Sequence, residues 1–433
     1  MAGASGQTCG EEWTVNSEQW TVGADREAED RAQGTGDRAG AGDEDRGQWT
    51  VNRGGWATGT VAWSVQTEID WGGATAAGTG AYAAGFPELA KTQHFRKLKL
   101  RETCLVSSLG LGTYLGEADA ATDNGYAAAL RAALAGGINL IDTASNYRQQ
   151  RSEQVIGKVL AEGLVRREQV VVCSKAGFIV SPEARDQHLR TGLIRPGEIV
   201  GDWHCMAPVY LAHQLERSLE NLGLQAVDVY YLHNPETQQA ELSREEFYRR
   251  LRGAFELLER QAEQGRIGAY GVATWSGLRV PPDAREYLDL NRMVGLAREL
   301  GGEKHHFRFV QMPYNLAMPE AYTLLNQTVE KPPYVSTLNA AFRLGLQVIA
   351  SASLMNGRLQ QLPEEGRAHV QGFLPAAATD AELALQFVRS TSGVLAGLVG
   401  MARSEHVREN LRAVAVAPAA PAVVGRLLGG EGD

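Results

Sequence analysis

The chain has 433 residues and a formal net charge of −9, from 51 acidic and 42 basic side chains. This balance disfavours nucleic acid and anionic lipid as partners and leaves small molecules as the expected ligands. No apolar run reaches the roughly 18 residues that a membrane span needs, and no secretory or organellar signal is evident, so we expect a cytoplasmic protein without a membrane segment.

The first 88 residues differ in composition from the rest of the chain. They contain neither Leu nor Lys and a single Ile, Ile69, but six of the eight tryptophans, which recur at seven-residue steps at Trp49, Trp56 and Trp63. Such a segment buries too little aliphatic surface to offset the entropy cost of ordering. We predict a disordered tail over residues 1–88 that is dispensable for catalysis. Three interpretations of this tail remain: it is an interaction segment, it is a weak β-forming repeat, or it has no selected role.

Eight short apolar runs then alternate with amphipathic helical patterns. The runs, which predict buried strands, are Leu109–Thr113, Asn139–Ala144, Val170–Ser174, Val227–Leu232, Gly268–Ala273, Phe307–Met312, Leu346–Ala350 and Val394–Gly400. The helical patterns include residues 124–135, 209–222, 244–264 and 381–389. Repeated β-α units with continuously apolar strands indicate a closed parallel sheet, an α/β fold of the (β/α)8 TIM barrel class. We place this barrel at residues 89–415, followed by a short flexible tail at 416–433.

An open, doubly wound sheet is the alternative fold. That fold carries a GxGxxG turn after its first strand. The nearest candidate, formed by Gly110, Gly112 and Gly116, has one residue too many before the third glycine. The barrel is therefore favoured.

Polar side chains follow three of the predicted strands, at the end of the barrel where chemistry is expected. Asp142 ends the run NLID, Lys175 ends VVVCSK and His233 ends VDVYYLH, while Tyr147 lies in the loop after Asp142. Taken singly, each of these residues has a structural explanation. Asp142 and Lys175 could form an ion pair inside the barrel, Tyr147 could be an aromatic residue of a loop, and His233 could be a hydrogen-bonded histidine at the rim. Four convergent groups favour an active site.

The motifs around these residues resemble the aldo-keto reductase family from about Val106 to Leu411. They include LGLGTYLG, GINLIDTASNYRQQRSEQVIG, VVVCSKAGF, LERSLENLGLQAVDVYYLHNPE and GLVGMARSEHVRENL, in family order. The resemblance implies reduction of carbonyl compounds with a nicotinamide cofactor, using an Asp, a Tyr, a Lys and a His from these strand ends.

The residues themselves fit that chemistry. Hydride delivered to a carbonyl carbon leaves an oxygen that needs a proton, and Tyr147 is the expected donor. We expect Lys175 to lower the pKa of Tyr147, and Asp142 to keep Lys175 charged and in place. His233 would donate a hydrogen bond to the substrate oxygen and polarise the carbonyl group.

The resemblance also implies residues that bind the nicotinamide end of the cofactor. Thr274 and Gln311 fill the positions that hold the carboxamide group, and Ser351 stands where the family often places an aromatic ring. The missing aromatic ring puts the affinity for the cofactor in question, but not the reaction. Further cofactor contacts are implied for Gly112, Thr113, Tyr114, Asp142, Leu354 and Gly400.

The adenine end is expected near the segment GMARSEHVREN. A helix N-terminus with nearby cations suits a ribose 2′-phosphate, and Arg403, Ser404, Glu409 and Asn410 are the candidates there. His406 stands where NADP-preferring relatives often carry a basic residue. NADP(H) is therefore favoured over NAD(H), which is the alternative.

The connection Ala176–Pro208 is the expected determinant of specificity, because it is long and follows a strand end. Within it, His204 or Trp203 could face the substrate. No metal site is expected: the four cysteines are widely separated, and His305 and His306 precede a strand at the opposite end of the barrel.

Three functions are weighed from these observations. The preferred one is an NADP-dependent reductase of a small-molecule aldehyde or ketone. An aldolase that forms a Schiff base on Lys175 is the second. The third is a non-catalytic sensor or subunit that binds a nicotinamide cofactor; an intact set of Asp142, Tyr147, Lys175 and His233 weighs against it. The substrate and the oligomeric state are not specified by the sequence.

Overall fold

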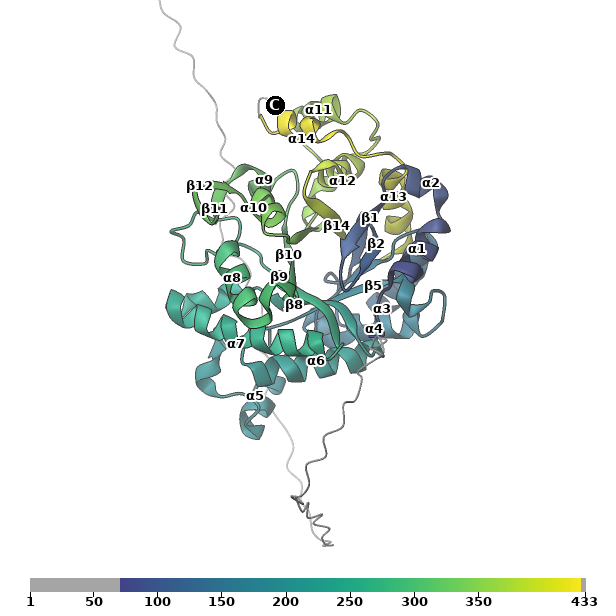
Figure 1. Cartoon of the computed structure of the whole chain (residues 1–433). Helices are drawn as coiled ribbons and strands as arrows, with labels where there is room; N and C mark the ends of the chain where they lie inside the picture. The colour runs from purple at the N-terminus through teal and green to yellow at the C-terminus, as the bar shows by residue number, and fades with distance from the viewer. Residues whose placement is uncertain (1–70, 430–433) are drawn as a thin grey trace, which may run out of the picture. The chain divides into compact units, whose positions relative to one another are not determined.

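Eight parallel strands close into a barrel in the computed structural model, which describes residues 71–429 (Figure 1). In chain order the barrel strands are β3 (Leu109–Gly112), β4 (Leu140–Asp142), β5 (Val171–Ala176), β8 (Val227–His233), β9 (Ile267–Ala273), β10 (Phe307–Pro313), β13 (Gln347–Ser351) and β14 (Val394–Gly400). Each strand pairs with its sequence neighbour in the barrel, and β14 pairs with β3. The predicted (β/α)8 barrel is confirmed, and the open-sheet alternative is wrong.

The strands are apolar throughout because both of their faces are covered. Alternate residues point inward, where Leu140, Val171 and Phe309 share one interior cluster. The residues between them, such as Ile141 and Val172, belong to the layer under the helices.

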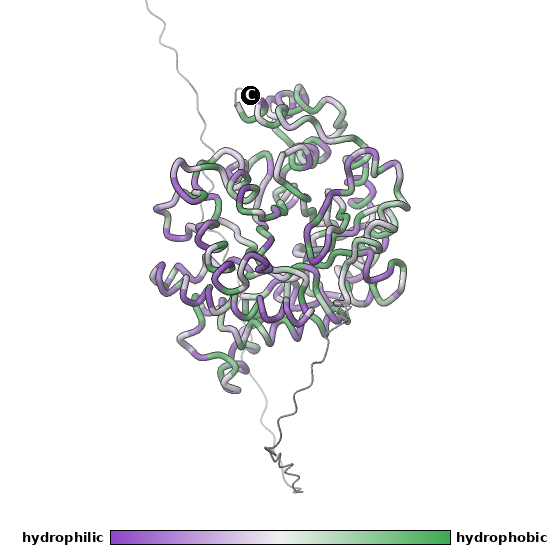
Figure 2. Tube along the Cα trace, in the orientation of Figure 1, coloured by the Kyte–Doolittle hydropathy of each residue, from purple (hydrophilic) through white to green (hydrophobic). Residues whose placement is uncertain are grey.

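Eight helices follow the eight strands and form the outer layer of the barrel. They are α3 (Ala120–Ala135), α4 (Arg151–Leu160), α6 (Pro208–Leu222), α7 (Arg244–Glu263), α8 (Leu290–Gly301), α10 (Thr337–Arg343), α12 (Asp380–Ser390) and α13 (Ser404–Val414). Hydrophilic and hydrophobic residues alternate along these helices (Figure 2). None of the described helices is long and apolar enough to cross a membrane.

Further elements lie in the connections. They are α5 (Pro182–Thr191), α9 (Glu320–Thr323), α11 (Glu364–Phe373), the strand pairs β6 (Ile199–Val200) with β7 (His204–Cys205) and β11 (Leu325–Val329) with β12 (Lys331–Ser336), and the 3₁₀ turns η1 (Tyr147–Gln150), η2 (Arg167–Gln169), η3 (Pro196–Glu198), η4 (Pro235–Ala240), η5 (Gly302–Lys304) and η6 (Met355–Gln360). The connection after β5 contains α5, β6 and β7, so the expected specificity segment has secondary structure of its own.

A hairpin of β1 (Phe95–Lys99) and β2 (Thr103–Ser107) precedes the first barrel strand. Its side chains Leu98, Cys104 and Val106 are fully buried and belong to the interior cluster of the barrel. The hairpin thus closes the N-terminal end of the barrel, opposite the strand ends that carry Asp142 and His233.

Residues 71–88, predicted as part of the tail, are packed against the barrel. They include α1 (Ala76–Ala84) and the start of α2 (Pro87–Lys91). The Ala74 amide donates to Asp228 Oδ1 at 2.7 Å, and the Tyr82 hydroxyl donates to the Leu134 carbonyl oxygen at 2.6 Å. The predicted boundary at residue 88 is therefore wrong, because aromatic and main-chain contacts replace the missing aliphatic surface. The rest of the predicted tail, with its tryptophan repeat, lies outside the described residues.

The C-terminal segment is also more ordered than predicted. Residues Pro421–Leu427 form α14, which lies beside α11 (Figure 1). Val424 and Leu427 are buried there. The predicted flexible tail at 416–433 is therefore wrong for α14, while residues 430–433 lie outside the described part of the chain.

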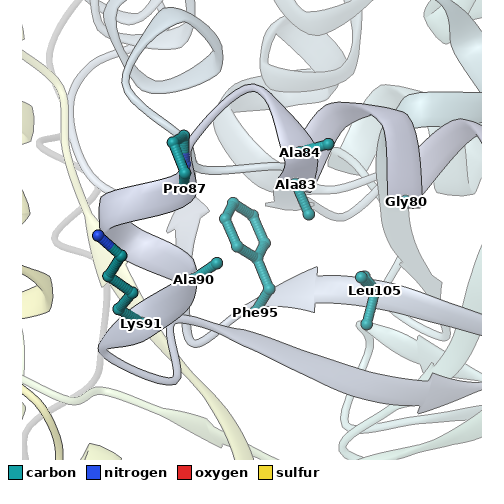
Figure 3. Close-up of a pocket in the computed structure, with 8 residues that line it drawn as sticks. All are labelled: Gly80, Ala83, Ala84, Pro87, Ala90, Lys91, Phe95 and Leu105. Carbon is teal, nitrogen blue, oxygen red and sulfur yellow. The ribbon is translucent and has the colours of Figure 1, made fainter.

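A pocket lies between α1, α2 and the β1–β2 hairpin (Figure 3). Its lining includes Ala83, Ala90, Phe95 and Leu105, with Lys91 as its charged member. It is built by the elements at the N-terminal end of the barrel and contains none of the predicted site residues.

Candidate active site

The four predicted catalytic residues lie together at the C-terminal ends of the strands. Asp142 is the last residue of β4, Lys175 the penultimate residue of β5 and His233 the last residue of β8. Tyr147 is the first residue of η1, in the loop that follows β4. The parallel pairing of β4 with β5 and of β5 with β8 brings the four side chains to one site.

Lys175 is held by three oxygen atoms. Its Nζ lies 2.5 Å from Asp142 Oδ1, 2.9 Å from the Thr143 carbonyl oxygen and 3.5 Å from the Tyr147 hydroxyl. The other carboxylate oxygen of Asp142 accepts from Gln311 Nε2 at 2.7 Å. A buried ion pair needs such further hydrogen bonds to offset the loss of hydration. Gln311, predicted as a cofactor ligand, thus also fixes the carboxylate in this structure.

The charges of this cluster follow from burial and pairing. Burial alone would lower the pKa of Lys175, but its pairing with Asp142 acts in the opposite direction and the pKa is raised, so the ammonium stays charged. Burial raises the pKa of Tyr147 above its ordinary value, with Lys175 acting in the opposite direction. The expected lowering by Lys175 is present, yet the expected net decrease is wrong, since burial dominates. Tyr147 is therefore protonated at neutral pH.

His233 faces this cluster as a neutral imidazole. Burial, followed by Lys175 and His204, lowers the pKa of His233 well below its ordinary value. Its ring meets the rings of Tyr147 and Phe178 edge-on, with centroids 5.6 and 5.0 Å apart. Its Nδ1 is buried without a hydrogen-bond partner among residues 71–429. A neutral ring keeps one N–H donor for a substrate oxygen.

An unusual backbone turn carries Tyr147. The next three residues, Arg148, Gln149 and Gln150, have φ angles of 50°, 54° and 72°, a left-handed conformation that costs roughly 1–2 kcal/mol for each non-glycine residue. Arg148 anchors the turn, because its Nη2 lies 2.5 Å from Asp123 Oδ1. Sequence reasoning missed Arg148: nothing in the letters YRQQ marks a strained turn.

The predicted residues for the nicotinamide end surround this cluster. Gly112, Ser351 and Gly400 are the last residues of β3, β13 and β14, and Thr113 and Leu354 are buried beyond strand ends. Tyr114 is 48% exposed, and its ring meets that of Tyr147 at 5.1 Å. These positions share the end of the barrel that carries Asp142 and His233.

Thr274 has partners within the protein. Its Oγ1 accepts from the Gly277 amide at 2.9 Å. The neighbouring Trp275 amide donates to Glu236 at 2.8 Å, and Glu236 is a buried carboxyl whose pKa is raised by burial. Sequence reasoning missed Glu236, which shapes the loop after β9. The one feature of the sequence that could have pointed to Glu236 is its position three residues after His233.

The residues present fit a polar cofactor at this end of the barrel. Thr143 Oγ1, Ser145 Oγ and Asn146 Oδ1 are buried and have no hydrogen-bond partner within the described chain. Buried polar atoms without partners are rare in native proteins and mark places for a polar ligand or water. They follow β4 directly, next to Asp142.

The predicted adenine-end residues lie on α13 or directly before it. Arg403 is the exposed N-cap residue, Ser404 the first helical residue, Asn410 is buried and Glu409 is exposed. Arg403 Nη2 donates to His406 Nε2 at 2.6 Å. An eleven-residue helix that starts beyond β14, with an arginine at its cap, is suited to a phosphate group.

The connection after β5 separates the two residues that are candidates for substrate contacts. His204 is fully buried, whereas Trp203 is 51% exposed. His204 Nε2 lies 2.7 Å from the main-chain oxygen of His233. Of the two, His204 therefore contacts the backbone of the site, and Trp203 is the one with an exposed side chain.

Comparisons with known proteins agree with this geometry. The profile of the Aldo/keto reductase family matches residues 108–372, more than half of the chain. L-glyceraldehyde 3-phosphate reductase of Escherichia coli is 24% identical over 337 residues, which cover 71% of this chain and 83% of the relative. D-threo-aldose 1-dehydrogenase of a Pseudomonas species is 31% identical over 181 residues, 41% of this chain and 52% of that protein.

Solved structures show the same fold. An aldo/keto reductase from Klebsiella pneumoniae, crystallised with NADP and acetate, has a TM-score of 0.53 at 22% identity and matches 78% of this chain and 96% of its own. The holo form of an aldo-keto reductase from Bacillus halodurans has a TM-score of 0.54 at 20% identity, with 78% and 98% covered. Together with the family match, these findings show that the chain belongs to the aldo/keto reductase family.

Proposed function

We propose that this protein reduces an aldehyde or ketone to an alcohol with NADPH, and that Tyr147 donates the proton. The observation that carries the proposal is the Lys175 ammonium, 2.5 Å from Asp142 and 3.5 Å from the Tyr147 hydroxyl, beside a neutral His233. Family membership supports the reaction class, and NADP bound to a relative from Klebsiella pneumoniae supports the cofactor.

The side chains divide the reaction between them. NADPH, when bound, supplies a hydride to the carbonyl carbon. His233 donates a hydrogen bond to the carbonyl oxygen and so favours the charge that develops there. The Tyr147 hydroxyl then transfers its proton to that oxygen. Lys175 stabilises the phenolate that remains, and Asp142 keeps Lys175 charged throughout.

The cofactor would be held at two places. Gln311 and Thr274 lie at the end that receives the nicotinamide carboxamide, with Ser351 in place of an aromatic ring. Arg403 and Ser404 begin α13, where the 2′-phosphate would lie. An arginine that can reorient from His406 to a phosphate supports the preference for NADPH over NADH.

The charge of Lys175 favours a reductase over a Schiff-base aldolase. A lysine that attacks a carbonyl carbon must be neutral, and such lysines have lowered pKa values. The pKa of Lys175 is raised by its pairing with Asp142, in the opposite direction. Borohydride trapping of a carbonyl compound on Lys175 would contradict this assignment.

Replacing Tyr147 with Phe tests the proposal. Wild-type protein and Tyr147→Phe are assayed for NADPH oxidation by absorbance, against aldehydes, ketones and quinones that include L-glyceraldehyde 3-phosphate and aldoses, because curated relatives are named for these. We expect turnover to fall by about 10²- to 10⁴-fold, the typical contribution of a general acid, while the NADPH Kd changes little.

Tyr334→Phe is the matched control, since this tyrosine is 45% exposed on β12. It should leave turnover unchanged. Unchanged hydride transfer in Tyr147→Phe, measured in a single turnover, would contradict the proposed role of Tyr147 even though the family assignment would stand.

A further inference from the structure

A second histidine lies directly behind His233. His204, the first residue of β7, is fully buried. Its Nε2 lies 2.7 Å from the main-chain oxygen of His233, and its Nδ1 lies 2.9 Å from Gln238 Nε2. Because His204 has no exposed surface, any effect on substrate must pass through its neighbours, among them His233.

The hydrogen bonds around His204 fix which ring nitrogen carries the proton. Arg250 Nη1 lies 3.0 Å from Gln238 Oε1, and since a guanidinium only donates, the amide oxygen must face it. Gln238 Nε2 therefore donates to Nδ1 of His204 and, at 3.0 Å, to the main-chain oxygen of the same residue. Because Nδ1 accepts, the proton of the neutral ring is on Nε2, which donates to the His233 carbonyl oxygen. Burial lowers the pKa of His204 to about 4, which preserves the neutral form.

The backbone leaves room for this bond at one glycine. Gly177, just beyond β5, has a φ angle of 142°, and a Cβ atom there would lie 2.8 Å from His204 Nε2 and 3.0 Å from the His233 carbonyl oxygen. The adjacent Phe178 ring meets both imidazoles edge-on, each at 5.0 Å between centroids. A side chain at position 177 would collide with both ends of the hydrogen bond.

His233 depends on this support because its own ring has little else to orient it. Its Nδ1 has no hydrogen-bond partner in the described part of the chain, so no side chain fixes the imidazole through that atom. The ring is placed by its backbone and by the rings of Tyr147 and Phe178. A shift of the strand end would therefore move the imidazole directly.

We propose that His204 is a positioning residue for His233: its Nε2–H holds the main-chain oxygen at the end of β8, and Gln238 and Arg250 hold His204. The connection between β5 and α6 thereby sets the geometry with which His233 meets the substrate oxygen. The inference rests on the proposed function, in which His233 polarises the carbonyl group.

Variants of His204 in the full chain test the proposal. His204→Phe keeps a planar ring and removes both nitrogens, whereas the amide of His204→Gln can still donate to the His233 oxygen. We expect His204→Phe to lower kcat about 10- to 100-fold, as for a small misplacement of a catalytic group, with the NADPH Kd unchanged. His204→Gln should recover most of the loss.

A matched control separates positioning from stability. His94 is another fully buried histidine with two ring hydrogen bonds, to Ser108 Oγ and the Gly137 oxygen, both at 3.0 Å. It lies at the closed end of the barrel. His94→Phe should lower the Tm and leave kcat unchanged. An equal loss of kcat in His94→Phe and His204→Phe would overturn the proposal, since both would then act through general destabilisation.

A double-mutant cycle tests whether His204 acts through His233. In a His233→Ala background, His204→Phe should cause no further loss of kcat. A second loss as large as that in the wild type would overturn the proposal. If His204→Phe does not fold, Gln238→Met replaces it, because that change removes the donor to Nδ1 and keeps both histidines. The same loss of kcat and the same non-additivity are expected.

A second readout needs no turnover and separates this inference from the proposed function. In protein labelled with ¹⁵N-histidine, the His233 ring resonances are assigned by their loss in His233→Ala. They should shift in His204→Phe and return in His204→Gln. Should no carbonyl compound be reduced, the proposed function fails while these shifts still support the positioning role; resonances unchanged in His204→Phe would overturn it.

Discussion

Lys175 keeps its charge in an interior that would ordinarily remove it. Asp142 lies 2.5 Å away on the neighbouring strand, and Gln311 holds the second carboxylate oxygen at 2.7 Å. The cost of burying the pair is offset only by this arrangement, so each partner is needed by the other. In the proposed reaction, the same ammonium would stabilise the phenolate that Tyr147 leaves after donating its proton.

Replacing Lys175 with Met should abolish most of the reduction, because without the cation the pKa of Tyr147 rises further and its acidity falls. The change also leaves Asp142 unpaired, which destabilises a protein by roughly 3–5 kcal/mol. The double variant Asp142→Asn with Lys175→Met should therefore recover stability but not turnover, measured by urea unfolding and single-turnover absorbance. Recovery of both would show that Lys175 serves structure alone.

Arg403 tests the cofactor preference at the other end of the site. Its guanidinium is exposed at the cap of α13, and a charge-assisted bond to a 2′-phosphate contributes about 1.5–3 kcal/mol. Arg403→Ala should weaken NADPH binding by roughly that amount and leave NADH binding nearly unchanged, as measured by fluorescence titration. Arg408→Ala, on the same helix, is the control. Equal losses for both cofactors would show that Arg403 does not read the phosphate.

At the scale of elements, the barrel strands could be predicted and the N-terminal helices could not. The apolar runs that form β8 and β14 begin at the predicted residues, because strands covered on both faces are apolar along their whole length. Helix α1 has the sequence AAGTGAYAA, with no large aliphatic residue, but its Tyr82 is buried, and so is Trp71, which precedes the helix. The prediction used the average composition of residues 1–88, and that average gave no weight to two single aromatic side chains.

Part of the candidate site could likewise be predicted from the sequence, and part could not. The proximity of Asp142, Tyr147, Lys175 and His233 could be predicted, because strand ends and family motifs mark these residues. His204 could not, since its role depends on a contact with a main-chain oxygen 29 residues away, which no local pattern encodes.

Trp71 tests whether the segment before α1 belongs to the folded domain. Its side chain is 8% exposed, and its ring lies over Gly268 at the start of β9. Trp71→Ala should lower the free energy of unfolding by about 3–5 kcal/mol, the usual cost for a buried Trp, without changing the NADPH Kd. Trp203→Ala, at a 51% exposed position, should cost far less. Equal effects of the two changes on the urea midpoint would place residue 71 outside the core.

Across the whole molecule, the two ends of the barrel have different tasks. The open end holds buried polar groups without a hydrogen-bond partner among the described residues, such as Thr143 and Ser145 beside Asp142. At the closed end His94 lies between Ser108 and Gly137, near Arg389 and Arg96. Stability should therefore depend on pH through groups that take no part in the chemistry.

His94 gives the sign of that dependence. Burial, followed by Arg389, lowers its pKa from 6.5 to about 3. Between these values the unfolded chain binds a proton that the native protein does not, so stability is full above pH 6.5 and falls as the pH drops. The slope is about 1.4 kcal/mol per pH unit for one such proton. His94→Gln should flatten the dependence of the unfolding free energy on pH by that amount between about pH 4 and pH 6, whatever the other groups contribute. A slope unchanged in His94→Gln, measured by urea unfolding across this range, would mean that His94 takes up its proton in the native state.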